Sequence, residues 1–236
     1  MCGRFIIIST PSGIVAKFLL MDFSFYTRYN IAPTQDIHGI IYDSELGRRI
    51  AHKYAWGLVP HWAKDKTNAG RMINARAETL SEKASFRAAF KHRRCLIPAS
   101  GFYEWKTEGG KKQPYLIRLK DEEIFAFAGI YEHWEKDGES LDTAAIITCE
   151  PNEFMSLIHT RMPVILNPDN YDEWLAPDNT DIASLSRLFV PCKSSRMNAH
   201  RVSNAVSNPR NEGPELIEEL MEKVDESGSL ISNGDL

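Results

Sequence analysis

The sequence lacks any long apolar run, and none of its segments approaches the roughly 18 apolar residues that a membrane-spanning helix needs. The short apolar segment Phe5 to Ile8, near the amino terminus, also lacks the charged flank and the length of a signal peptide. We therefore expect no membrane partner. The sequence predicts a protein that stays inside the cell.

Cysteine is scarce and widely scattered. The four cysteines are Cys2, Cys95, Cys149 and Cys192, and no two of them form a Cys-x-x-Cys pair. This spacing argues against both a zinc knuckle and a disulfide framework, so reduced thiols are expected. The seven histidines add no spacing typical of metal ligands. We therefore predict no metal and no cofactor.

Positive charge is not in excess, since 28 Lys and Arg stand against 32 Asp and Glu, for a net charge of -4. That balance argues against a simple nucleic-acid binder until its distribution is considered. From Glu212 onward there are eight acids and only one base, Lys223, which leaves 27 bases against 24 acids, or +3, on the first 211 residues. A basic face is compatible with this asymmetry, and so is an ordinary solvated surface with scattered charges.

With 236 residues, 43% of them apolar, the chain has ample length for a buried core. No internal repeat or interior linker is visible, so we predict a single domain over residues 2–224 and a flexible acidic tail over residues 225–236. Short β-like runs alternate with a few helical segments and are joined by turn-rich connectors, which predicts an α+β fold with mainly antiparallel strands.

The expected elements can be given by residue range. Strands are predicted at Arg4 to Ile8, Ile37 to Tyr42, Arg49 to Trp56, Cys95 to Ala99, Tyr115 to Leu119, Ile124 to Tyr131, Thr143 to Thr148 and Pro163 to Leu166. Helices are predicted after Thr10, after Ser81, at Asn152 to His159, at Ile182 to Phe189 and at Pro214 to Val224.

The second residue is a cysteine. If the initiator Met1 is removed, Cys2 carries an α-amine beside its thiol. The reference pKa of an α-amine is roughly 7.7 to 8.0, so a useful fraction is an unprotonated nucleophile at neutral pH. That amine can attack an aldehyde to form an imine, and the thiol can then close a five-membered thiazolidine. A cysteine at position 2 is, by its position alone, more often incidental than catalytic.

Three further segments carry residue types that suit carbonyl chemistry. Asn74 and Arg76 stand among small residues, where they could orient an amine and hold an anion. Glu104 lies among aromatic neighbours, and partial burial there would raise its pKa toward the range of a general acid or base. His159 supplies a titratable imidazole two residues before Arg161. A polar turn, an outward glutamate and a structural histidine explain the three segments nearly as well when each is taken alone.

Together these segments resemble the SOS response-associated peptidase (SRAP) family, which captures abasic sites in single-stranded DNA covalently. The matching motifs occur in family order and span residues 2 to about 220. They are Met1-Cys2-Gly3-Arg4-Phe5, Tyr29-Asn30-Ile31-Ala32-Pro33, Trp56-Gly57, Asn74-Ala75-Arg76-Ala77-Glu78-Thr79, Glu104-Trp105-Lys106, His159-Thr160-Arg161-Met162-Pro163, Arg201-Val202-Ser203-Asn204-Ala205-Val206 and Asn211-Glu212-Gly213. With the resemblance we expect a barrel-like, twisted sheet core flanked by helices.

The resemblance implies a mechanism for the mature protein. The Cys2 amine attacks C1′ of the ring-opened abasic sugar, and the thiol closes a thiazolidine that links protein to DNA. His159 assists opening of the sugar ring, Glu104 shuttles protons, and Asn74 positions the amine. A weak abasic-site lyase activity follows from the shared imine. The family name adds a thiol autopeptidase reaction, in which Cys2 releases Met1.

The resemblance also implies which residues contact DNA. Arg4, Arg76 and Arg161 match positions that hold phosphates, while Pro33 and Trp62 match positions that present apolar surface to bases. Many members have Trp-Trp at the latter position, whereas this chain has Trp62-Ala63 and a longer connector to Asn74. The expected partner is single-stranded DNA that contains abasic sites. We expect a monomer of the bacterial or phage type, located in the cytoplasm and at the nucleoid when it is bound to DNA.

Two other functions remain open. A thiol peptidase would use Cys2 as nucleophile, His159 as base and Asn74 as orienting residue on peptide substrates. A passive single-strand binding module would leave Cys2 incidental and would show strong salt dependence without a covalent adduct.

Overall fold

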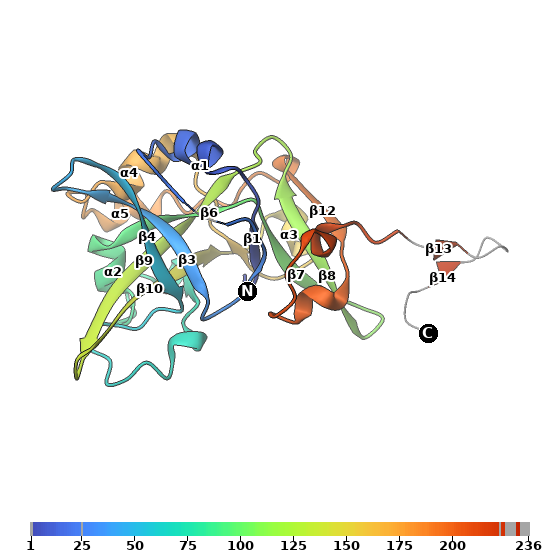
Figure 1. Ribbon diagram of the computed structural model, residues 1–236, viewed down its shortest axis with the longest axis horizontal. Coiled ribbons are helices and arrows are strands. Elements are labelled where there is room, and N and C mark those ends of the chain that lie inside the picture. Colours follow the sequence, from blue (N-terminus) through green and yellow to red (C-terminus); the bar gives the residue numbers. More distant parts are fainter. Residues whose placement is uncertain (1, 25, 222, 225–229, 232–236) are drawn as a thin grey trace.

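The computed structural model describes residues 2–24, 26–221, 223–224 and 230–231. Its largest feature is a closed ring of strands, with a short strand attached on each side of β10. The strands of the ring lie together on one side of the molecule (Figure 1). The ring closes because β10 pairs with both β4 and β9, and all neighbours in it are antiparallel except β10 and β4. Its strands are β3 (Asp36–Asp43), β4 (Arg48–Trp56), β6 (Arg94–Ala99), β9 (Phe125–Lys136) and β10 (Glu139–Cys149), and the attached strands are β5 (Asn74–Arg76) and β11 (Met162–Pro163).

A second sheet lies beside this barrel (Figure 1). Its strands run in the order β12 (Met197–Arg201), β8 (Lys111–Leu119), β7 (Gly101–Glu108), β1 (Phe5–Ile7) and β2 (Arg28–Ile31), and every neighbouring pair is antiparallel. The prediction of an α+β fold with a mainly antiparallel, barrel-like core is confirmed.

Helices are short and lie around the sheets (Figure 1). In α1 the Thr10 side chain accepts a hydrogen bond from the Gly13 amide, and Pro11 begins the helix, as the sequence predicts. The α-helices are α1 (Pro11–Phe18), α2 (Arg87–His92), α3 (Glu153–Ser156), α4 (Tyr171–Leu175) and α5 (Ile182–Ser186). Single 3-10 turns occur at Ala69–Arg71, Ala77–Thr79, Pro168–Asn170, Ser194–Arg196, Asn204–Ser207 and Pro214–Ile217.

Aromatic side chains join the barrel to the second sheet. The Phe5 ring on β1 packs edge to face against Trp56 of β4 at 5.1 Å between centroids, and against Phe127 of β9 at 5.8 Å. All three rings are fully buried. Because Phe5 is fixed between the two sheets, Cys2 is delivered to the junction between them.

The predicted helix at Pro214 to Val224 is wrong. The chain forms only the 3-10 turn Pro214–Ile217, and Glu218 is already extended. Tertiary contacts use the carbonyls that a helix would need, since Tyr103 donates to the Leu216 carbonyl and His200 contacts that of Ile217. Farther on, β13 (Lys223–Val224) pairs with β14 (Leu230–Ile231), and the remainder of the predicted tail lies outside the described residues.

Candidate active site

Cys2 lies three residues before the start of β1, with its side chain completely buried. Its carbonyl oxygen accepts a hydrogen bond of 2.8 Å from Nδ2 of Asn74. Asn74 begins β5, which runs parallel to β10 with Asn74 opposite Ile146, so the barrel holds the amide in place. Within the described residues, the buried Oδ1 of Asn74 has no hydrogen-bond partner. This acceptor is therefore available to a donor at Cys2.

Glu104 reaches the same point from the second sheet. Phe102 pairs with Phe5, and the Tyr103 amide donates to the Arg4 carbonyl at 2.9 Å, so β7 brings Glu104 toward Cys2. The Glu104 residue is only 2% exposed, and burial raises its pKa to about 7. Burial also raises the pKa of the Cys2 thiol, and the nearby Glu104 charge adds to that effect. The thiol is therefore protonated at neutral pH.

His159 lies in the turn between α3 and β11, and its Nε2 is 3.8 Å from Oε2 of Glu104. The Arg161 amide donates to Nδ1 at 3.0 Å. A backbone N–H can only donate, so in this arrangement Nδ1 is the bare acceptor and the 3.3 Å approach of the Arg161 carbonyl is not a hydrogen bond. The ring proton is then on Nε2, facing Glu104. Burial lowers the pKa of His159, which favours this neutral form.

The four predicted catalytic residues are thus brought together from separate elements. Cys2 and Glu104 come from the second sheet, whereas Asn74 and His159 come from strands and turns beside β10. A nucleophile, a carboxyl that titrates near neutrality and a neutral imidazole are the groups that proton-coupled addition to a carbonyl needs.

Two of the arginines predicted to bind phosphate, Arg76 and Arg161, differ in exposure and in the ion pairs that they make within the protein. Arg76 is exposed at the end of β5 and has no ion-pair partner within the described residues. The Arg161 side chain is 13% exposed and makes a two-pronged ion pair with Glu78 at 2.8 and 2.9 Å, besides donating to the Thr148 carbonyl at 2.7 Å. Arg76 is therefore ready to bind an anion, while Arg161 would have to share or exchange Glu78.

Arg4 is directed into the protein. Its Nη1 donates to Oδ1 of Asn30 at 2.8 Å and to the Val206 carbonyl at 2.7 Å, and its guanidinium lies 5.9 Å from the centre of a Trp105 ring. Only 9% of the residue is exposed. These contacts connect β1 to the segment after β12, so a role for Arg4 in holding phosphate stays a prediction.

The two residues predicted to meet DNA bases lie in loops. Pro33 is half-buried in the turn between β2 and β3, and Trp62 is 57% exposed in the connector that follows β4. Trp62 therefore presents a large apolar face to solvent, as a base-stacking residue would.

Two residues near the site escaped sequence reasoning. The positive charge of Lys112, on β8, acts on the pKa of both Glu104 and His159. Lys112 pairs with Thr107 across the β7–β8 hairpin. Had the hairpin been predicted from the turn Glu108-Gly109-Gly110, the strand pairing would have placed Lys112 beside the strand that carries Glu104. Asn30 stands in the motif Tyr29-Asn30-Ile31-Ala32-Pro33, but the sequence assigns it no role. It binds Arg4 and also donates to the carbonyls of Asn208 and Asn211 at 3.0 and 2.8 Å.

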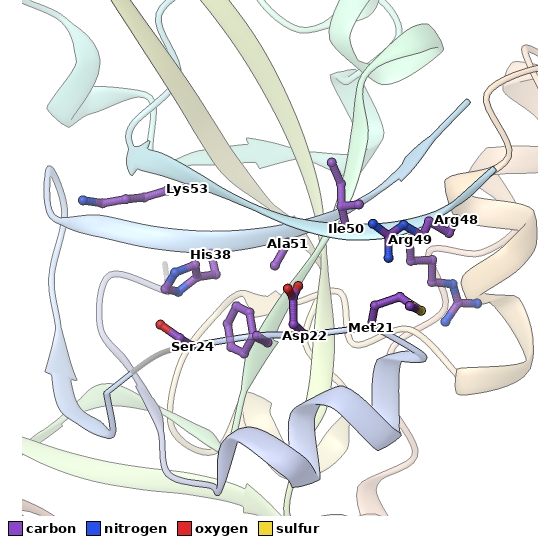
Figure 2. Close-up of a pocket in the computed structure, with 10 residues that line it drawn as sticks. Met21, Asp22, Ser24, His38, Arg48, Arg49, Ile50, Ala51 and Lys53 are labelled. Atoms are coloured by element: carbon purple, nitrogen blue, oxygen red, sulfur yellow. The ribbon is translucent and has the colours of Figure 1, made fainter. Parts of the chain in front are cut away.

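A separate cavity of about 250 Å³ lies between β3, β4 and the segment Met21 to Ser24 (Figure 2). His38, Arg48 and Lys53 are among the residues that line it, but none of the predicted site residues does. In the part of the chain that the structure describes, no group of three or more His, Cys, Asp and Glu side chains is arranged to hold a metal ion. No helix among those residues is long and apolar enough to cross a membrane.

Fold and site together define a class: two-sheet α+β proteins in which a cysteine at the second position meets an asparagine, a glutamate and a histidine between the sheets. Residues 1–209 match the family described as SOS response associated peptidase (SRAP), and the chain belongs to that family.

Curated relatives agree with this assignment. The abasic site processing proteins YoqW and YoaM of Bacillus subtilis are 48% and 46% identical to this chain, over 92% of its length and 99% and 98% of theirs. A crystal structure of a protein from Bacteroides thetaiotaomicron superimposes with a TM-score of 0.81 at 30% identity, covering 93% of this chain and all of that one.

Proposed function

We propose that this protein captures abasic sites in single-stranded DNA by forming a covalent thiazolidine through Cys2 after Met1 has been removed. The observation that carries the proposal is the convergence of Asn74, Glu104 and His159 on Cys2. The relatives named abasic site processing proteins support the choice of substrate.

The reaction has two bond-forming stages. The unprotonated Cys2 amine adds to the C1′ aldehyde, and loss of one water from the resulting carbinolamine gives an imine. The thiol then adds across the imine, so that sulfur bonds to C1′ and its proton ends on the nitrogen. The raised pKa of the thiol supports this order, because the amine is the better nucleophile at neutral pH while the thiol stays protonated.

Glu104 is suited to both proton transfers. A carboxyl with a pKa of about 7 is present in both forms near neutrality, so it can protonate the departing hydroxyl and later accept the thiol proton. His159 faces Glu104 with Nε2–H and can donate a hydrogen bond to the ring oxygen of the closed sugar, which assists opening of the ring. Arg76 supplies an exposed cation for a neighbouring phosphate.

Removal of Met1 is the step that frees the amine. Attack of the Cys2 thiol on the Met1 carbonyl carbon would transfer the methionyl group to sulfur, and water would then release methionine and restore the thiol. Glu104 is the nearby group able to accept the thiol proton. Thiol peptidase action on other peptides is the alternative function, and cleavage of an unrelated peptide that is lost in Cys2→Ser would favour it.

Intact mass spectrometry tests the proposal before and after incubation with a single-stranded oligonucleotide carrying one abasic site. We expect a starting mass without Met1 and a product that keeps the oligonucleotide through denaturation. Cys2→Ala should give no adduct, and an oligonucleotide without the abasic site is the matched control. Loss of Met1 without any adduct would refute capture of abasic sites.

A further inference from the structure

The cavity between the β3–β4 hairpin and the segment Met21 to Ser24, which belongs to the connection from α1 to β2, lies apart from the reaction site (Figure 2). Its volume of about 250 Å³ is just below the range of typical small-ligand pockets, about 300 to 1,000 Å³. A ligand of mononucleotide size suits this space, and a longer chain would extend beyond it. None of the residues assigned above to the reaction or to DNA contacts lines the cavity.

Two of the cations that line the cavity have partners within the protein. Nζ of Lys53 lies 2.6 Å from Oδ2 of Asp36, and both side chains are exposed at the surface. Arg49 is buried, donates to the Phe18 carbonyl at 3.2 Å and pairs with Asp172 at 2.5 Å. Arg49 is therefore held in one position at the edge of the cavity.

Arg48 is the lining cation that can take a new partner. It is exposed, and within the described residues its side chain makes no hydrogen bond or ion pair. Asp43 lies opposite Arg48 on β3, but its Oδ1 accepts hydrogen bonds from two backbone amides of the hairpin turn, at 2.9 and 3.0 Å. The adjacent guanidinium groups of Arg48 and Arg49 are the donors that a phosphate group prefers.

Asp22 disfavours a ligand that is negative along its whole length. Its side chain is exposed, lines the cavity and has no ion-pair partner in the part of the chain that the structure describes. A polyphosphate or a DNA strand would bring a further phosphate near this carboxylate, and like charges repel. A sugar hydroxyl would instead donate a hydrogen bond to it.

Neutral polar groups and a ring surface lie beyond Asp22. The ring of His38 packs edge to face against Phe23 at 4.8 Å between centroids, and Ser24 adds a hydroxyl. Burial lowers the pKa of His38, and the positive charge of Lys53 adds to that effect, so the imidazole is neutral at neutral pH. A neutral imidazole both donates and accepts, as the edge of a nucleobase requires.

The arginine end and the imidazole end are separated by the length of a small nucleotide. His38 pairs with Lys53, which follows Arg49 by four residues on β4, or about 13 Å along the strand. Figure 2 shows Asp22 between these ends, with the two arginines on one side and His38 on the other. An extended nucleoside monophosphate likewise carries its phosphate and its base at opposite ends, with the sugar between them.

We propose that this cavity binds a free nucleoside monophosphate. Arg48 and Arg49 hold the phosphate, and Asp22 accepts a hydrogen bond from a sugar hydroxyl. The base lies against Phe23, with its edge at His38. The site is separate from the groups proposed to react with DNA, so it stands whether or not the proposed function holds.

Isothermal titration calorimetry of the full-length protein tests the cavity. The probes are the 5′-monophosphates of adenosine, guanosine, cytidine and uridine, the nucleosides without phosphate, and inorganic phosphate. We expect one saturable site for at least one monophosphate, with its nucleoside and inorganic phosphate each bound at least about 10-fold more weakly. Lack of saturable binding by every monophosphate would overturn the proposal, as would equal affinity for inorganic phosphate.

Arg48→Ala and Asp22→Ala test the two halves of the ligand. Arg48→Ala should weaken the monophosphate about 10-fold and leave the nucleoside unchanged, whereas Arg87→Ala, which removes an exposed arginine of α2, should change neither. Asp22→Ala should weaken the monophosphate but strengthen inorganic phosphate, since it removes both a hydrogen-bond acceptor and a negative charge. Tighter binding of both probes would make Asp22 a repulsive charge only and would overturn the nucleotide assignment.

A single-stranded oligonucleotide without an abasic site distinguishes a free nucleotide from a DNA strand. We expect it not to displace the bound monophosphate. Displacement that is lost in Arg48→Ala would show that the cavity holds a strand and would overturn the proposal. None of these measurements uses an abasic site, so failure of the crosslink would leave their outcome unchanged.

Discussion

His159 and Glu104 face each other across the site, with 3.8 Å between Nε2 of the imidazole and Oε2 of the carboxyl. The backbone amide of Arg161 donates a hydrogen bond to Nδ1 of His159. The ring N–H of His159 is therefore on Nε2, which is directed toward Glu104. One group titrates near pH 7 and the other is held neutral by burial. Within this pair Glu104 is therefore the group that gains and loses a proton near neutral pH, while the neutral His159 presents its Nε2–H as a hydrogen-bond donor.

Glu104 should make the stability of the protein depend on pH. Its folded-state pKa of about 7 is above the ordinary value of 4.5, so the folded protein binds this proton more tightly than the unfolded chain. The resulting stabilisation, on the order of 3 kcal/mol, is complete below about pH 4.5 and is lost as pH rises through about 7. Urea unfolding at pH 5 and pH 8 measures it. Glu104→Gln should reduce that difference, and an equally large difference in the variant would contradict the assignment.

Cys2→Ser separates the two stages of the proposed reaction. A serine at the processed amino terminus keeps the α-amine but loses the thiol that closes the stable ring. Where the variant is produced without Met1, we expect no adduct that survives denaturation, but a full adduct once borohydride reduces the imine. Gel electrophoresis with and without the reductant distinguishes the two, and Cys2→Ser forming the stable adduct would show that sulfur is not required.

Asn74→Ala should disturb Cys2 more than it disturbs the fold. The substitution leaves the Cys2 carbonyl without its donor, and we expect a loss of about 1 kcal/mol in the free energy of unfolding. Crosslinking should slow by about 10-fold or more, because the amine is no longer fixed. Rapid-quench kinetics at saturating DNA, compared with urea unfolding, tests this split. A rate that falls only in proportion to the folded fraction would make Asn74 purely structural.

Arg76 and Arg161 should respond differently to removal. Arg76→Ala should reduce the slope of log binding constant against log salt by about 1, with stability unchanged within about 0.5 kcal/mol. Arg161→Ala removes the partner of Glu78 and of the Thr148 carbonyl, so it should lower both DNA binding and stability. Salt titrations and thermal unfolding measure the two effects. Arg87→Ala is the control for loss of a positive charge, and an unchanged salt slope in Arg76→Ala would remove Arg76 from the DNA surface.

Arg4→Lys distinguishes a phosphate contact from an internal one. Lysine keeps the charge but cannot reproduce the contacts of the guanidinium with Asn30 and the Val206 carbonyl, so we expect a loss of about 2 kcal/mol in the free energy of unfolding. DNA affinity of the folded fraction should stay close to that of the wild type. A stable variant with weakened DNA binding would place Arg4 at the phosphate backbone instead.

The sequence predicted the four catalytic residues better than it predicted the contacts of the neighbouring arginines. Cys2, Asn74, Glu104 and His159 each stand in a short motif whose residue types match one chemical task, and the structure brings them together. The arginines could not be ranked in this way, because their partners are remote: Arg4 binds Val206, 202 residues away, and Arg161 binds Glu78, 83 residues away.

The errors in the fold have the same origin. A local amphipathic pattern predicted a helix from Pro214, but the carbonyls there are used by Tyr103 and His200 from other strands. The strands β3, β4, β9 and β10 were found because their apolar runs are local, but β7, which carries Glu104, was not predicted as a strand. The three-residue β5 exists through its pairing with β10 and carries no pattern of its own.

The hydrogen bond from Arg4 to the Val206 carbonyl can form only after residue 206 has been synthesised, so it also bears on when the amino-terminal strand is anchored. A nascent chain emerging from the ribosome has its second residue exposed long before residue 206 leaves the exit tunnel, so the strand that follows Cys2 stays without this anchor until Val206 has emerged. The amino-terminal strand can therefore gain this contact only after most of both sheets has been synthesised. Translation products that end before residue 206 would lack it.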